Sequence, residues 1–302
     1  MTARPAVAEP APVPYRPRHV RAQDGCGLFV RDYPAAPGAG PKTPVLCLSG
    51  IARTSADFDA LARRLAARGH RVIAPDYRGR GRSERSPDPD RYRPEVYLDD
   101  LRHAVTALDV APMAVVGTSL GGGLAMALGV ALPTRLRAVV INDIGPDVPT
   151  DGVGRVAGYI ASGRSYADWE EATAALQELT PDLNPGPGET ARPEDWRRAA
   201  EATYHRADDG RLHPNWDPAI ARPLLRGDPP PDLWPLFASL RRLPCLVIRG
   251  GRSDILSAET LERMEAAHPR LRTLTLPTKG HAPTLDEPQS LEAVDELLET
   301  LA

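Results

Sequence analysis

The sequence is poor in cysteine and in aromatic side chains, and it has no strong excess of either charge. Its 302 residues include three cysteines, and 5% of them are aromatic. The formal net charge is -3, with 37 Lys and Arg against 40 Asp and Glu. Because this near balance offers no basic footprint, we expect neither a nucleic-acid partner nor an anionic membrane partner.

The three cysteines also give no sign of a metal centre. Cys26, Cys47 and Cys245 form no CxxC pair and no spacing typical of metal ligands. Cys47 and Cys245 fall within apolar runs, so we expect both to be buried thiols. We expect no metal and no organic cofactor.

Long apolar segments are missing as well. The longest apolar stretch, near residues 120–132, is too short to span a bilayer and contains small residues throughout. The first 19 residues are rich in Pro and Ala and lack the continuous apolar region of a secretion signal. We predict a cytoplasmic protein with a disordered tail at residues 1–18. The oligomeric state stays open.

Short apolar runs recur along the rest of the chain and predict a parallel sheet. They are mostly continuous rather than alternating, as in strands covered on both faces. A further strand at residues 27–33 follows the turn signal Asp24-Gly25, as the second arm of an opening hairpin would. The apolar runs are residues 45–48, 72–74, 113–116, 138–141, 245–248 and 271–276.

Helical patterns alternate with these runs, which indicates an α/β fold with helices on both faces of the sheet. The alternation lapses between about Gly145 and Pro235, where Pro-rich turns occur and no convincing strand appears. We therefore predict a core of residues 19–145 and 236–302, with a helical cap at residues 146–235. All four tryptophans lie in this cap. Most should stabilise it, and one or two could line a substrate pocket.

The most informative motif is Gly-Thr-Ser-Leu-Gly at residues 117–121, between an apolar strand and a helix-forming stretch. A serine on such a tight turn is strained and projects above the sheet, and the glycines avoid collisions there. The amino end of the following helix favours developing negative charge. Ser119 is therefore the predicted nucleophile.

A serine hydroxyl needs a base, and the base needs an orienting acid. His281 follows the run at 271–276 and lies on a loop at the carboxyl end of a strand, where catalytic groups of open α/β sheets collect. Asp254, after the run at 245–248, is the preferred acid. Asp143 is the rival, because it also follows a strand and also precedes His281. An Asp before a Gly-Pro turn is often a local cap, and we therefore rank Asp143 second.

Two backbone amides should bind the oxyanion. Leu120, the residue after the nucleophile, supplies one, and Ile51 in the loop at residues 49–53 is the best candidate for the other. Arg53 could contact a substrate carbonyl or carboxylate, or pair with an acidic residue, and we favour the structural role. The Arg-rich segment at residues 76–83 lacks the Lys-Ser/Thr ending of a phosphate-binding loop.

Together, these motifs resemble the α/β-hydrolase superfamily from about His19 to Ala302. The resemblance rests on the segment 76–83, the turn at Ser119, Ser253-Asp254 and Gly280-His281, which follow one another in the order expected for the family. It implies a mostly parallel eight-stranded sheet, a lid after the sixth strand, and a triad of Ser119, Asp254 and His281. One departure is Ser49-Gly50, where the family usually has His-Gly.

The sequence therefore predicts a serine hydrolase that cleaves carboxylic ester or lactone bonds in small to medium organic substrates, through an acyl-enzyme. One alternative is hydrolysis of a carbon-carbon bond in a vinylogous diketone, which the same scaffold performs. A second is a ligand-binding protein with a vestigial site.

Overall fold

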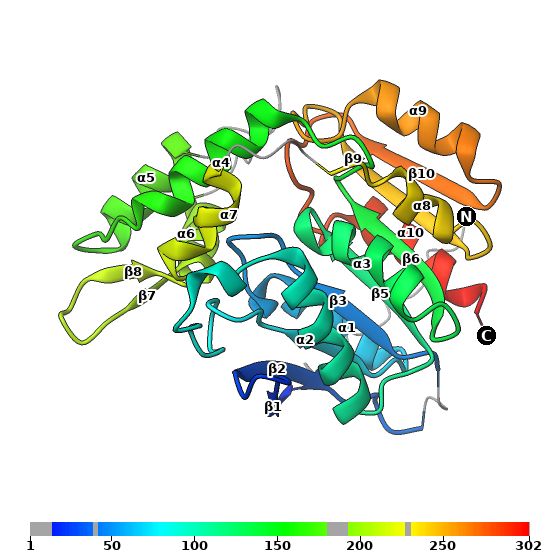
Figure 1. Ribbon diagram of the computed structural model, residues 1–302, viewed down its shortest axis with the longest axis horizontal. Coiled ribbons are helices and arrows are strands. Elements are labelled where there is room, and N and C mark those ends of the chain that lie inside the picture. The colour runs from blue at the N-terminus through cyan, green and yellow to red at the C-terminus, as the bar shows by residue number, and fades with distance from the viewer. Residues whose placement is uncertain (1–13, 39–41, 180–192, 227–230, 302) are drawn as a thin grey trace, which may run out of the picture.

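The computed structural model describes residues 14–38, 42–179, 193–226 and 231–301. Its main element is an eight-stranded sheet in the order β1-β2-β4-β3-β5-β6-β9-β10 (Figure 1). The pairs β1/β2 and β2/β4 are antiparallel and all the others are parallel. The strands of the sheet are β1 Arg16–Arg21, β2 Gly27–Tyr33, β3 Val45–Leu48, β4 Val72–Pro75, β5 Met113–Thr118, β6 Leu136–Asn142, β9 Cys245–Gly250 and β10 Leu271–Leu276.

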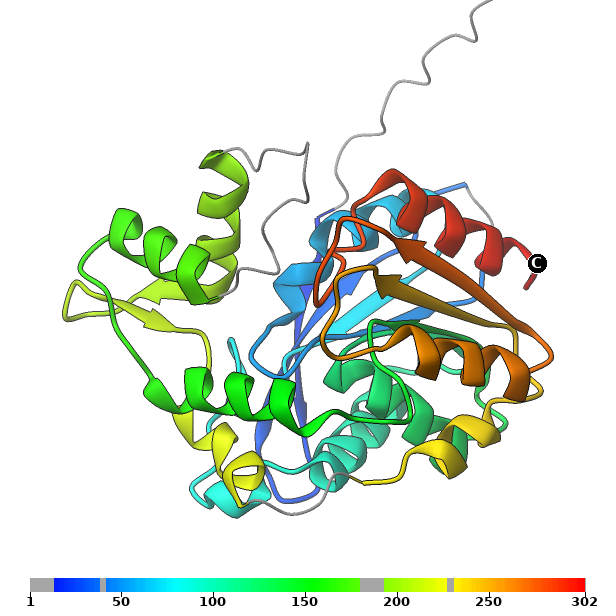
Figure 2. The same ribbon diagram turned by 90° about the horizontal axis from the view of Figure 1, so that it is seen from above.

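The helices cover both faces of the sheet, as the alternating pattern predicted (Figure 2). Side chains of α1 and α10 share one apolar cluster with one face of the strands. Side chains of α2, α3, α8 and α9 share another cluster with the opposite face. These helices are α1 Asp59–Ala67, α2 Pro94–Ala107, α3 Leu120–Ala131, α8 Trp234–Ser239, α9 Ala258–Ala267 and α10 Pro288–Glu299.

The hairpin at the start of the sheet corrects one predicted boundary. Residues 1–13 of the predicted tail lie outside the described residues, but Arg16 to Arg18 belong to β1 and pair with β2 rather than being disordered. An edge strand tolerates Pro17 and exposed arginines, because only one of its sides needs hydrogen bonds. The core therefore begins before His19.

A mostly helical insertion separates β6 from β9, where the sequence predicted a cap. It holds the helices α4 Thr150–Ser162, α5 Trp169–Leu179, α6 Pro193–Thr203 and α7 Arg222–Leu225. The expectation that it has no strand is wrong, because β7 Tyr204–Arg206 and β8 Leu212–Pro214 form a short antiparallel hairpin. Part of the insertion has its own apolar cluster, which includes Trp196. Trp216 instead packs in the cluster of the sheet.

Two cysteines that the sequence predicted to be buried lie in the core of the sheet. Cys47 and Cys245 are buried free thiols within β3 and β9, and burial raises the pKa of both. Across the described residues, no helix combines the length and apolarity that crossing a membrane requires.

Candidate active site

Ser119 lies at the junction of β5 and α3, in a backbone conformation that side chains rarely adopt. Its φ and ψ are 52° and -117°. Such a strained residue persists only where its surroundings enforce it, and strained residues of this kind cluster at functional sites. The turn is held by Ser119 N–H, which donates to the Asn142 carbonyl at 2.9 Å, and by Gly122 N–H, which donates to the Ser119 carbonyl at 2.8 Å.

Two glycines make this turn possible because backbone atoms approach them closely. A Cβ on Gly117 would lie 2.2 Å from the Gly121 carbonyl oxygen, and a Cβ on Gly121 would lie 2.0 Å from the Leu48 carbonyl oxygen. Neither obstacle is a flexible side chain that can move aside. The spacing of the motif therefore follows from how tightly α3 packs over β5 and β3.

We expect Gly121→Ala to destabilise the fold by about 3 kcal/mol or more and to abolish activity, since overpacking against backbone forces the turn apart. Gly123→Ala is the matched control, because nothing lies within 4 Å of the position of its added Cβ. The control should match or slightly exceed wild-type stability. Chemical unfolding of both variants measures the difference, and equal stability of the two would contradict this explanation of the motif.

His281 contacts Ser119 directly. Its Nε2 atom lies 3.0 Å from Ser119 Oγ, and its Nδ1 atom lies 2.8 Å from Asp143 Oδ2. A carboxylate can only accept, so Nδ1 carries the proton and Nε2 is the acceptor for the serine hydroxyl. The His281 side chain is 16% exposed and that of Asp143 is fully buried, so the carboxylate is shielded from water and the imidazole edge is accessible.

Asp143 is fixed on both sides of its carboxylate. Its Oδ1 atom accepts a hydrogen bond from Gly250 N–H at 2.8 Å, while Oδ2 faces His281. The Asp143 backbone N–H also donates to the Ile248 carbonyl at 2.8 Å. Its φ of 58° turns the chain sharply after β6. The residue thus stays attached to β9 and does not act as the local turn cap that its sequence suggested.

The prediction that Asp254 orients His281 is wrong. The Asp254 side chain is 39% exposed and pairs with Arg155 of α4, with 2.5 Å between Arg155 Nη2 and Asp254 Oδ2. The physical reason is its place in the chain. Asp254 lies four positions beyond the end of β9 at Gly250, after a turn in which Ser253 N–H donates to the Gly250 carbonyl. Asp143 follows β6 immediately, and β6 adjoins the strand that leads to Ser119.

Asn142 is a structural part of the site that the sequence did not reveal. Its fully buried side chain donates from Nδ2 to Thr118 Oγ1 at 3.0 Å and to the Pro283 carbonyl at 2.8 Å. These bonds connect the end of β5 with the loop that carries His281. The only signal in the sequence was a polar residue directly after the apolar run at residues 138–141.

The loop at residues 49–53 lies beside the nucleophile, as the oxyanion prediction requires. A Cβ on Gly50 would lie 3.8 Å from Ser119 Cβ. The Gly50 carbonyl accepts from Arg53 N–H at 3.3 Å, which closes the turn. Because a peptide group is normally trans, the Ile51 N–H points away from that carbonyl. Leu120 begins α3, and the first amides of a helix have no acceptor within the helix.

Arg53 forms structural contacts on both sides of this loop. Its guanidinium makes two 2.7 Å hydrogen bonds to the Asp57 carboxylate and one of 2.7 Å to Thr203 Oγ1 of α6. The structural role favoured for Arg53 agrees with these contacts. Arg53 links the loop beside Ser119 to the insertion.

The fold and the site together define an α/β protein in which a strained serine, a histidine and a buried aspartate meet at the carboxyl ends of parallel strands. Among the described residues, no three or more His, Cys, Asp or Glu side chains are grouped so as to hold a metal ion. A family model for the alpha/beta hydrolase fold matches residues 43–288, so this chain belongs to the α/β-hydrolase family.

The chain is similar to hydrolases in both sequence and structure. The chain is 31% identical over 264 residues to a 3-hydroxybutyrate-oligomer hydrolase of Cupriavidus necator, covering 84% of this chain and 87% of the relative. It is 28% identical to a 2-(acetamidomethylene)succinate hydrolase of Mesorhizobium japonicum, covering 81% and 82%. The crystal structure of an alpha/beta hydrolase from Novosphingobium aromaticivorans is 41% identical and has a TM-score of 0.87, covering 94% and 98%.

Proposed function

We propose that this chain is a serine hydrolase that cleaves carboxylic ester or lactone bonds through an acyl-enzyme, with Ser119, His281 and Asp143 as its catalytic residues. The observation that carries the proposal is the continuous contact from Ser119 Oγ through His281 to the buried Asp143 carboxylate. Asp143 takes the place that the sequence gave to Asp254.

In the first half of the reaction, Ser119 Oγ attacks the ester carbonyl carbon and its proton passes to His281 Nε2. The carbonyl oxygen becomes an oxyanion, which the amides of Ile51 and Leu120 stabilise. When this tetrahedral intermediate collapses, the carbon-oxygen bond to the alcohol breaks and His281 returns the proton to the leaving oxygen. The buried Asp143 carboxylate stabilises the imidazolium that forms in between.

In the second half, a water molecule attacks the acyl carbon and gives its proton to His281 Nε2. The bond to Ser119 Oγ then breaks, the serine recovers its proton, and the carboxylic acid leaves. The two amides stabilise the second oxyanion in the same way. The two proton transfers between Ser119 and His281 use a contact that already lies within hydrogen-bond distance. The other two pass between His281 Nε2 and the leaving alcohol or the attacking water.

Oligoesters of 3-hydroxybutyrate are the first substrates to test, because the relative with 31% identity is named for that activity and matches most of both chains. Carbon-carbon bond hydrolysis is the second candidate. A relative of comparable coverage acts on 2-(acetamidomethylene)succinate, so substrates differ widely within this group. The same serine, base and amides serve either reaction.

We expect purified protein to hydrolyse the 3-hydroxybutyrate dimer or trimer with a kcat/KM of about 10⁴ M⁻¹ s⁻¹ or higher, in the range typical of enzymes on their own substrates. Titration of released acid measures this rate. The panel should include short p-nitrophenyl esters, lactones and a vinylogous diketone, each repeated with protein inactivated by a fluorophosphonate. A rate on the diketone that exceeds every ester and lactone rate would replace the ester assignment with the second candidate.

A further inference from the structure

The Arg-rich segment at residues 76–83 takes no part in the proposed mechanism, yet it packs directly against the loop at residues 49–53. Asp76 Oδ1 accepts from Ser55 N–H at 2.7 Å, and Tyr77 Oη donates to the Ser49 carbonyl at 3.2 Å. Arg80 Nε donates to the Ile51 carbonyl at 2.9 Å. The segment therefore holds the loop that presents the proposed oxyanion donor.

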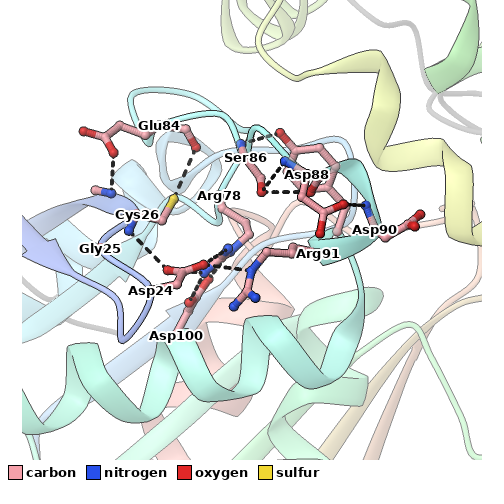
Figure 3. A network of polar contacts seen from close by, with 12 residues as sticks. Asp24, Gly25, Cys26, Arg78, Glu84, Ser86, Asp88, Asp90, Arg91 and Asp100 are labelled. Carbon is pink, nitrogen blue, oxygen red and sulfur yellow. Dashed lines mark hydrogen bonds and ion pairs between the residues drawn. The ribbon is translucent and has the colours of Figure 1, made fainter.

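Two arginines of this segment are buried, and their surroundings differ. Arg78 is neutralised by two carboxylates, with Asp24 2.7 Å from its Nη1 and Asp100 2.6 Å from its Nη2. Figure 3 shows this guanidinium between the two acids. A buried arginine that is paired in this way is part of the folded framework.

Arg80 is 1% exposed, and within the described parts of the chain no carboxylate lies at ion-pair distance from it. Its Nη1 atom donates to the Arg78 carbonyl and to Tyr97 Oη, at 2.9 and 2.7 Å. Its guanidinium also lies 4.6 Å from the centre of the Tyr97 ring. Its Nη2 atom is buried and has no hydrogen-bond partner among the described residues. Arg80 thus keeps an unneutralised positive charge inside the protein.

Burial of a charge without a counterion is unfavourable, so a protein retains one where the charge has a use. The oxyanion of the proposed reaction forms beside the Ile51 N–H. Arg80 binds the carbonyl of the same residue, which lies in the next peptide group. Standard bond lengths and the 2.9 Å hydrogen bond keep the Arg80 Nε atom within about 7 Å of the Ile51 nitrogen. At that distance, in a poorly solvated interior, the positive charge favours negative charge that develops in the transition state.

We propose that Arg80 is a positioning residue for ester hydrolysis: by holding the Ile51 carbonyl it restrains the residue whose N–H is the proposed oxyanion donor, and its unpaired charge stabilises the oxyanion. This inference rests on the proposed function. Because both effects act on the transition state rather than on the bound substrate, removing Arg80 should lower kcat and leave KM nearly unchanged.

The test compares Arg80→Met with Arg82→Met on a p-nitrophenyl ester. Arg82 is two residues away and exposed, and its guanidinium lies 4.1 Å from the centre of the Phe29 ring, so its variant matches the change in net charge. We expect Arg80→Met to lower kcat about 10- to 100-fold with KM within twofold, and Arg82→Met to behave as wild type. Binding of a phenylboronic acid, which forms an anionic tetrahedral adduct with the serine, should weaken in Arg80→Met by the same factor as kcat/KM.

Two further variants keep the test decisive if Arg80→Met does not fold, which circular dichroism and a thermal midpoint will show. Arg80→Lys keeps the charge but loses the geometry of the guanidinium, and Tyr97→Phe removes one acceptor of Arg80. Both should lower kcat about 3- to 10-fold at constant KM.

Wild-type kcat in the folded Arg80 variants overturns the inference, as does a loss confined to KM. The ester activity of the wild-type protein is measured first. If the wild-type protein hydrolyses no ester, the proposed function fails. If the wild-type protein is active and the Arg80 variants are equally active, only the inference about Arg80 fails.

Discussion

Asp143→Asn will lower kcat/KM for ester hydrolysis by about 10⁴-fold, a loss typical of triads whose acid becomes an amide. The reason lies in the two bonds of the Asp143 carboxylate. Oδ1 accepts from Gly250 N–H, so the oxygen of an asparagine will stay on that side and its NH2 group will face His281 Nδ1. The imidazole must then present a lone pair at Nδ1 and carry its proton on Nε2. In that tautomer, His281 cannot accept the proton of Ser119.

Asp254→Asn is the matched control for this prediction. It makes the same chemical change at the acid that the sequence favoured, and it breaks an exposed ion pair with Arg155. Exposed ion pairs contribute about 0–1 kcal/mol to folding stability. Because Asp254 pairs with Arg155 rather than with His281, we expect kcat/KM within about twofold of wild type. Steady-state rates of both variants on one ester give the comparison. A large loss in Asp254→Asn with near wild-type rates in Asp143→Asn would reverse the assignment of the acid.

Ser119→Ala will lower kcat by about 10⁴-fold or more, because no acyl-enzyme can form without the nucleophile. We expect little change in stability, since the exchange removes one hydroxyl from a half-buried site and leaves the backbone turn in place. Ser239→Ala is a suitable control, since this serine is exposed and its side chain donates to the nearby Leu236 carbonyl. Rates on the same ester, with thermal midpoints for both variants, complete the measurement. Ester turnover by Ser119→Ala at more than a few per cent of the wild-type rate would be incompatible with a serine nucleophile at this position.

The sequence predicted those parts of the fold and site that depend on local pattern. Continuous apolar runs identified the parallel strands, because residues buried on both faces leave no alternation. The motif around Ser119 was recognisable because close backbone contacts require glycine at Gly117 and Gly121. His281 was recognisable from its place after the last strand.

The acid was not predictable in this way, because Asp143 and Asp254 both follow strands and both precede His281. The choice depends on the turn after β9, which carries Asp254 outward, and on the approach of β9 to the loop before His281. A Cβ on Gly250 would lie 2.3 Å from the Gly280 carbonyl oxygen, so the end of β9 and the loop before His281 lie close together. From this position, Gly250 N–H also donates to Asp143 and orients its carboxylate. The bonds from Gly250 and His281 to Asp143 join residues more than 100 positions apart, and no local pattern records them.

The start of the core was misjudged for a related reason. Residues 16–18 are charged, proline-containing and exposed, and a disordered tail has the same composition. Their order comes from pairing with β2, which is a property of the partner strand. The roles of Ile51 and Leu120 as oxyanion donors stay predictions, with the position of the loop and the start of α3 in their favour.

The most direct test of the central claim is the site of covalent labelling by a fluorophosphonate in the wild-type protein. After inactivation to completion, digestion and peptide mass spectrometry will place one phosphonyl group per chain on Ser119, and Ser119→Ala will not be labelled. A label on another residue, or a wild-type protein that hydrolyses esters while it stays unlabelled, would contradict the assignment of Ser119 as the nucleophile.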